Sequence, residues 1–120
     1  MRKVLSFAPM ALLALSAFTF GCAPEVGNDG DVVGGHCHVS SECSPDSQCL
    51  TGERWPEGYC AKLCVSDADC PEGSACTQDG NFCLVSCASN ADCREDHGYT
   101  CTARPGRGGV VGDVMVCARD

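Results

Sequence analysis

The chain has 120 residues, of which 13 are cysteine, and its formal net charge is −8. Of its nominally hydrophobic residues, 13 are the cysteines and 14 lie in the first 21 residues. Little apolar material therefore remains for a conventional core. This composition argues against a reducing cytosol and is typical of small exported domains that are held together by disulfides.

The first 21 residues are typical of a signal peptide. Arg2 and Lys3 give it a positive start, residues 4–20 are uncharged and mostly apolar, and small residues follow. A membrane-spanning helix is the alternative. However, an apolar stretch of 17 residues that is interrupted by Pro9 is barely long enough to cross a bilayer. We therefore expect residues 1–21 to act as an export signal.

Cys22 makes the cysteine count odd, since the other 12 cysteines fall in an ordered pattern. Its position directly after Gly21 resembles the lipobox of bacterial lipoproteins, in which the cysteine is acylated and becomes the N-terminus. The presence of Ala23 rather than aspartate then implies sorting to the outer membrane. The alternative is that signal peptidase cuts after Ala23 and removes Cys22. We expect Cys22 to be lipidated.

Residues 22–36 are expected to contain the lipidated cysteine and a flexible tether. The part from residue 23 onward contains four glycines, one proline and three acids, and it has no cysteine. Such a composition favours a chain without a packed core. The alternative is a disordered N-terminus that has no anchor.

The remaining 12 cysteines form three repeats of four, which occupy residues 37–63, 64–86 and 87–120. Each repeat begins C-x5-C, and the third cysteine follows after five residues in repeats 1 and 2 and after seven in repeat 3. The spacing to the fourth cysteine is 10, 6 and 15 residues, and three residues separate the repeats. A constant linker with one variable loop is typical of a tandem module whose variable loop lies on the surface.

Each repeat is expected to combine a short helical turn with a small β-hairpin. Ser66-x-x-Asp69 and Ser89-x-x-Asp92 fit the capping box that starts a helical turn. The segment between the third and fourth cysteines is expected to form the hairpin, with Asp79-Gly80 at its turn in repeat 2. The predicted fold class is small and disulfide-rich, with three tandem repeats, little regular secondary structure and no conventional core.

Two disulfides per repeat would supply the stability that such small units lack. Four cysteines allow three pairings, and the sequence does not choose among them. We expect the first cysteine to pair with the third and the second with the fourth. The expected bridges are Cys37–Cys49, Cys43–Cys60, Cys64–Cys76, Cys70–Cys83, Cys87–Cys101 and Cys93–Cys117.

Residues 64–76 (CVSDADCPEGSAC) combine an acidic D-x-D-C step with C-P-x-G-x-x-C. Together with the tandem spacing, they resemble the cysteine-rich tandem-repeat lipoproteins of the myxobacterial type, over residues 37 to 117. A more distant likeness is to the N-terminal cysteine-rich module of Dickkopf proteins. That module has C-x2-C cysteines that this chain lacks, so we carry over no binding role. The first resemblance implies localisation in the cell envelope and no defined chemistry.

Metal binding has little support in the sequence. Zinc knuckles use closely spaced pairs such as C-x2-C, which do not occur here, and the cysteine of the cluster at 36–38 (HCH) is needed for its repeat. Calcium is a weaker alternative, since Asp67, Asp69 and Asp79 lie in the acidic second repeat. No calcium-loop motif accompanies them, so we expect no metal and no cofactor.

Catalysis and nucleic-acid binding are not expected either. No nucleophile-elbow, phosphate-loop or paired-carboxylate motif occurs, and His97 lies in what is expected to be a loop insertion. All 16 acidic residues follow residue 21, against six basic residues. Nucleic-acid contacts need clusters of Lys and Arg, and anionic lipid would repel an acidic body. Membrane attachment is therefore expected through a lipid anchor only.

The long hairpin of repeat 3 is the best candidate contact site, through Arg104, Pro105, Gly106 and Arg107. Its alternative is a variable solvated loop without a special role. We expect a non-enzymatic, exported lipoprotein of the cell envelope, with a structural or interaction role and an unknown protein or envelope partner. The alternative is a soluble secreted protease inhibitor or binding effector that uses the loop at 104–109, since a preorganised loop favours inhibition.

Overall fold

The structure is a computed structural model that describes residues 25–109 and 111–119. The predicted signal peptide and Cys22 lie outside these residues. Within the described ranges, no helix has the length and apolar character needed to cross a membrane. Regular structure there consists of short 3-10 turns and two-stranded antiparallel sheets, so the predicted fold class is confirmed.

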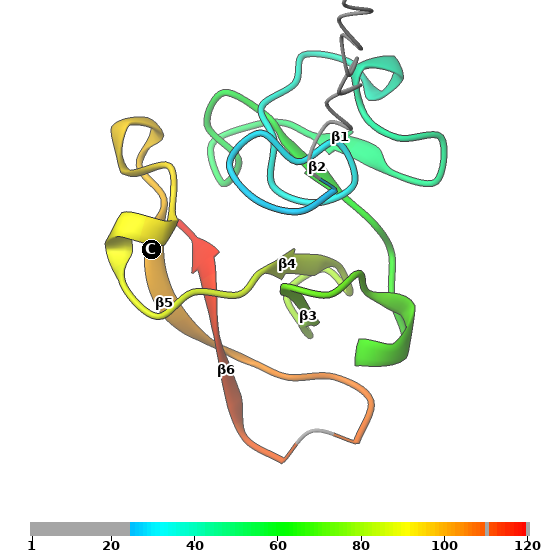
Figure 1. The fold of residues 1–120 in the computed structure, drawn as a ribbon, viewed down its shortest axis with the longest axis vertical. Helices are drawn as coiled ribbons and strands as arrows, with labels where there is room; N and C mark the ends of the chain where they lie inside the picture. The colour runs from blue at the N-terminus through cyan, green and yellow to red at the C-terminus, as the bar shows by residue number, and fades with distance from the viewer. Residues whose placement is uncertain (1–24, 110, 120) are drawn as a thin grey trace, which may run out of the picture.

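Each repeat contains a 3-10 turn followed by a hairpin (Figure 1). Repeat 1 has η1 (Ser40–Glu42), β1 (Gln48–Leu50) and β2 (Tyr59–Ala61). Repeat 2 has η2 (Asp67–Asp69), β3 (Ser74–Cys76) and β4 (Cys83–Val85). Repeat 3 has η3 (Asn90–Asp92), a second turn η4 (Glu95–His97), and the longest hairpin, formed by β5 (Thr100–Pro105) and β6 (Asp113–Ala118).

A carboxylate closes the first turn of every repeat. Asp69 Oδ2 accepts the backbone N–H groups of Val65 (2.8 Å) and Ser66 (3.2 Å), and Glu42 and Asp92 make the equivalent pairs of bonds. These bonds hold the pKa of each carboxyl below its ordinary value, because they stabilise the charged form. Repeat 1 has Val39 where the other two repeats have serine. The carboxylate is therefore the part of the predicted capping box that all three repeats share.

A second side chain ties each turn to its hairpin. Ser40, Asp67 and Asn90 stand three residues after the first cysteine of their repeats. Each accepts the backbone N–H of the third cysteine, at 3.0, 2.8 and 2.9 Å respectively. No motif in the sequence predicted this contact. Its signal is an oxygen-bearing side chain that recurs at one position in all three repeats.

The hairpins place the third and fourth cysteines of each repeat directly opposite one another, as in the pair Cys76 and Cys83. The two opposed cysteines do not bond to each other, because each is bonded to a cysteine of the segment that carries the turn. The turn is thus stapled to its hairpin twice. The six disulfides have the expected pairing: Cys37–Cys49, Cys43–Cys60, Cys64–Cys76, Cys70–Cys83, Cys87–Cys101 and Cys93–Cys117.

The prediction of a flexible tether is wrong for residues 25–36. Gly34 N–H donates to the carbonyl of Cys60 (2.8 Å), and Cys60 N–H donates back to the carbonyl of Gly35 (2.9 Å). Val33 is fully buried in the main core cluster. Gly34 has φ of +110°, and a Cβ there would lie 2.5 Å from a methyl group of Val85. The glycines therefore permit close packing in this segment and are not a sign of flexibility.

The repeats pack on one another around a buried arginine, Arg94, of which 6% is exposed. Its guanidinium carbon lies 4.6 Å from the ring centre of Tyr99 and 5.7 Å from that of Tyr59, within cation–π range. Arg94 Nη2 donates to the carbonyl of Gly58 (2.7 Å), and Nη1 donates to His97 Nδ1 (2.9 Å). Groups of repeat 1 thus hold the side chain of Arg94, which belongs to repeat 3.

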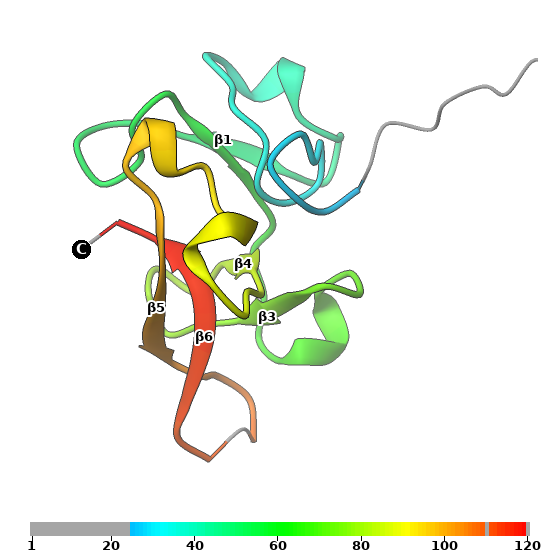
Figure 2. The same cartoon turned by 60° about the vertical axis from the view of Figure 1, so that its left-hand side comes forward.

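Two tyrosine hydroxyls complete the contacts between repeats. Tyr99 of repeat 3 donates to the carbonyl of Pro56 (2.9 Å), and Tyr59 of repeat 1 accepts the N–H of Val85 (2.9 Å) from repeat 2. Burial raises the pKa of Tyr99 to about 12 and that of Tyr59 further. β4 also lies beside β6, where Ser86 bridges to Val116 (Figure 2). The three repeats therefore form one packed body.

Candidate binding pocket

One pocket lies where all three repeats meet. It is lined by Arg54 from the β1–β2 loop, Gln78 and Asp79 from the β3–β4 loop, and Arg104 and Pro105 from β5, and its volume is about 390 Å³. The β3–β4 loop turns at Gly80 and Asn81, whose φ angles are +74° and +64°. The left-handed residues are therefore one position later than the predicted Asp79-Gly80 turn would place them.

Asp79 lines the pocket and contacts both arginines. Its Oδ1 pairs with Arg54 Nη2, and its Oδ2 lies 3.5 Å from Arg104 Nε. The side chain of Asp79 is 14% exposed, whereas that of Arg54 is 67% exposed. Both carboxylate oxygens of Asp79 therefore have partners within the protein, while most of the Arg54 side chain is open to solvent.

The predicted contact loop at 104–107 is only in part an exposed surface. Arg104 Nη2 donates to the carbonyl of Arg119 (2.8 Å), and its side chain is 21% exposed. Gly106 is buried, and its carbonyl accepts Gln78 Nε2 at 2.9 Å. Arg107 N–H donates to the carbonyl of Cys76 (3.0 Å). The start of the β5–β6 loop thus lies against repeat 2, whereas Gly108 and Gly109, farther along the loop, are exposed.

The three acids proposed for calcium are each bonded to donors of the protein. Asp67 accepts the N–H of Cys76, and Asp69 accepts two N–H groups of its own turn. Asp79 pairs with Arg54 and Arg104. The structure therefore gives each of these carboxylates a separate structural partner and does not bring the three into one ligand set.

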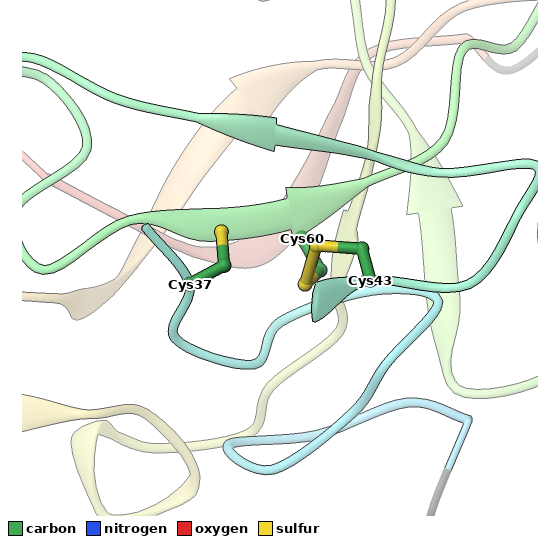
Figure 3. A group of neighbouring side chains, drawn as sticks. All are labelled: Cys37, Cys43 and Cys60. Carbon is green, nitrogen blue, oxygen red and sulfur yellow. A yellow bond between two sulfur atoms is a disulfide. The ribbon is translucent and has the colours of Figure 1, made fainter. Parts of the chain in front are cut away.

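Close groups of sulfur atoms are present in every repeat. Cys37, Cys43 and Cys60 of repeat 1 have sulfurs within 4.8 Å of one another. Figure 3 shows these three side chains, which come from the turn segment and from β2. A thiolate is the metal ligand, whereas these sulfurs are all in disulfides. The groups arise because two bridges run side by side between the turn and the hairpin. In the oxidised protein they are structural.

The histidines serve separate local contacts. His38 Nδ1 lies 3.6 Å from Glu42 Oε1 at an exposed turn, and His36 is exposed. His97 Nδ1 accepts from Arg94, which can only donate, and its Nε2 lies 3.7 Å from Asp96 Oδ2. His97 therefore supports the buried arginine that joins repeats 1 and 3.

Three pocket residues were not joined to the loop at 104–107 from the sequence: Arg54, Gln78 and Asp79. Arg54 and Asp79 lie 25 residues apart in different repeats, and no local spacing signals their contact. Comparison of the chain with protein-family models, with curated proteins and with solved structures finds no match. The resemblances to tandem-repeat lipoproteins and to Dickkopf modules remain predictions.

Proposed function

We propose that this chain is an exported cysteine-rich lipoprotein of the bacterial cell envelope that acts by binding or by a structural role and not by catalysis. The disulfides are the main support. Six bridges use all 12 cysteines of the three repeats, and Cys22 stands outside that set. An odd cysteine in an exported chain needs a separate fate, and acylation after the signal peptide provides one.

The folded N-terminal segment changes how such an anchor would work. Hydrogen bonds hold the segment from Glu25 onward, including the bond from Val32 N–H to the carbonyl of Glu25 (3.1 Å). Cys22 lies three positions before Glu25, a reach of about 10 Å at full extension. An acylated Cys22 would therefore hold the body close to the membrane surface, where the anchor provides the attachment that an acidic protein lacks.

Intact-mass measurement of the mature protein, purified from membranes, tests this proposal. The expected result is a diacyl or triacyl addition at Cys22, with a further gain of two hydrogens per bridge for six bridges after reduction. The Cys22→Ser variant is the control and should lose both the lipid mass and the membrane fraction. A soluble product that begins at Pro24 would contradict the lipoprotein proposal.

A further inference from the structure

We propose that the pocket between Arg54, Asp79 and Arg104 binds a side-chain carboxylate of an acidic peptide. This inference names a ligand class for the interaction role proposed above and therefore depends on it. The pocket is open to solvent, is lined by residues of all three repeats, and at about 390 Å³ lies within the size range of ligand sites. It exists only when the repeats are assembled.

The charge of the pocket favours an anion. Arg54 and Arg104 share the single carboxylate of Asp79. Arg119 adjoins them, because Arg104 donates to its carbonyl and its own guanidinium donates to the carbonyl of Glu53. Among the five lining residues two are arginines and one is an acid, so the lining carries a formal charge of +1 in a chain whose formal net charge is −8.

Arg54 is the residue that we expect to contact the ligand. One terminal nitrogen of its guanidinium pairs with Asp79, and the side chain is 67% exposed at the pocket rim. The planar guanidinium matches a carboxylate with two parallel hydrogen bonds. Asp79 holds Arg54 in place, so less conformational entropy is lost when a ligand binds.

The remaining lining favours a peptide carboxylate over a phosphate. Pro105 contributes an apolar ring, and Gln78 is held by its Nε2 on the carbonyl of Gly106, which leaves its amide oxygen as an acceptor for a peptide N–H. A phosphate dianion has no N–H to donate to the Gln78 amide oxygen, whereas a peptide has one. The combination of guanidinium, amide and apolar wall suits an extended peptide that carries aspartate or glutamate.

Fluorescence anisotropy with a labelled, amidated hexaglutamate peptide and the full mature protein tests the inference. Arg54→Gln is expected to weaken binding by about tenfold, which corresponds to the loss of one charge-assisted hydrogen bond. Arg54→Lys keeps the charge but loses the planar fork, and should also weaken binding. Lys62→Gln makes the same change in net charge outside the pocket lining, and should change affinity by less than about twofold.

Competition experiments separate the ligand classes. N-acetylglutamate amide should displace the peptide at high concentration, whereas inorganic phosphate at equal ionic strength should not. Equal weakening by Arg54→Gln and Lys62→Gln, or displacement by phosphate as effective as that by the glutamate derivative, would overturn the inference. The number of disulfides, measured by mass for each variant, verifies folding. The lipid addition at Cys22 is read separately, so failure of the pocket inference leaves the anchor proposal intact.

Discussion

The inside of each repeat and the contacts between repeats are built from different interactions. Inside a repeat, the disulfides join residues 12 to 24 positions apart, and the turn carboxylates bond three or four residues back. Between repeats, the hydrogen bonds of Val85, Arg94 and Tyr99 span 26, 36 and 43 residues. The first set recurs three times, whereas the second occurs once. The comparison indicates that each repeat is specified locally and that the arrangement of the repeats depends on a few buried groups.

The largest expected effect comes from removing a bridge within a repeat. Replacing both Cys93 and Cys117 with alanine should lower the free energy of unfolding by about 3 kcal/mol, because the bridge closes a loop of 24 residues in the unfolded chain. Guanidinium denaturation of the oxidised proteins measures the change.

Removing the shorter bridge of repeat 1 is the matched control for that variant. Cys37 and Cys49 are 12 residues apart, half the separation of the other pair. Their replacement with alanine should cost about 0.6 kcal/mol less, because the loop-closure entropy depends on the logarithm of loop length. A greater loss for the shorter loop would show that contacts, and not chain entropy, dominate the contribution of the bridges.

A smaller effect is expected from breaking the contact between repeats at Arg94. Arg94→Met keeps much of the side-chain volume but removes the bonds to Gly58 and His97 and the cation–π contacts. We expect a loss of about 2 kcal/mol in the free energy of unfolding. Hydrogen exchange should show that β1–β2 and β5–β6 open separately in the variant, while they open together in the parent protein.

Arg107→Met is the control for Arg94→Met. Arg107 is half-buried in the same repeat, and its bond to Cys76 is made by the backbone N–H, which the substitution retains. The change in free energy should stay within about 0.5 kcal/mol. If the two variants were equally destabilised, the buried contact of Arg94 would not be what joins the repeats.

The difference between local contacts within repeats and long-range contacts between repeats explains which features the sequence could predict. The repeat boundaries, the turns and the hairpins follow from cysteine spacing and from short motifs such as Ser66-x-x-Asp69, whose partners are close in the chain. The disulfide pairing does not follow from the spacing, which leaves three pairings open in each repeat. The burial of Arg94 does not follow from any local motif, since it depends on Tyr59 and Tyr99, which lie in different repeats. The segment at 25–36 was misinterpreted because glycines that permit close packing have the same composition as glycines in a flexible chain.

The pocket shows a similar limit. Arg104 and Pro105 were selected from the sequence as part of an exposed loop, and both do line the pocket. Arg54 and Asp79 were not joined to them, because pairing across three repeats depends on how the repeats pack. Local sequence features thus predicted part of the pocket lining. The other lining residues are brought together by contacts between repeats.

The smallest expected effect is the acid sensitivity of the three turns. Each of Glu42, Asp69 and Asp92 accepts two backbone N–H bonds, which lower its pKa in the folded state. Their contribution to stability is therefore fully present above the unfolded pKa of about 4 and is lost as the pH falls through the lower folded pKa. Below about pH 4, the hydrogen-exchange protection factors of Val65 and Ser66 should fall before those of β2 and β4 do.

The variant that combines Glu42→Gln, Asp69→Asn and Asp92→Asn tests the origin of this acid response. Its amides can accept hydrogen bonds but do not titrate, so its turns should be weaker at neutral pH and should change less between pH 5 and pH 2. NMR titration of the side-chain carboxyls in the parent protein should place all three pKa values below their ordinary range. If the variant lost stability in acid as steeply as the parent protein, groups outside the turns would be the cause of the acid sensitivity. Within the repeats, the disulfides should persist throughout this range, because acid protonates the turn carboxylates without reducing the bridges.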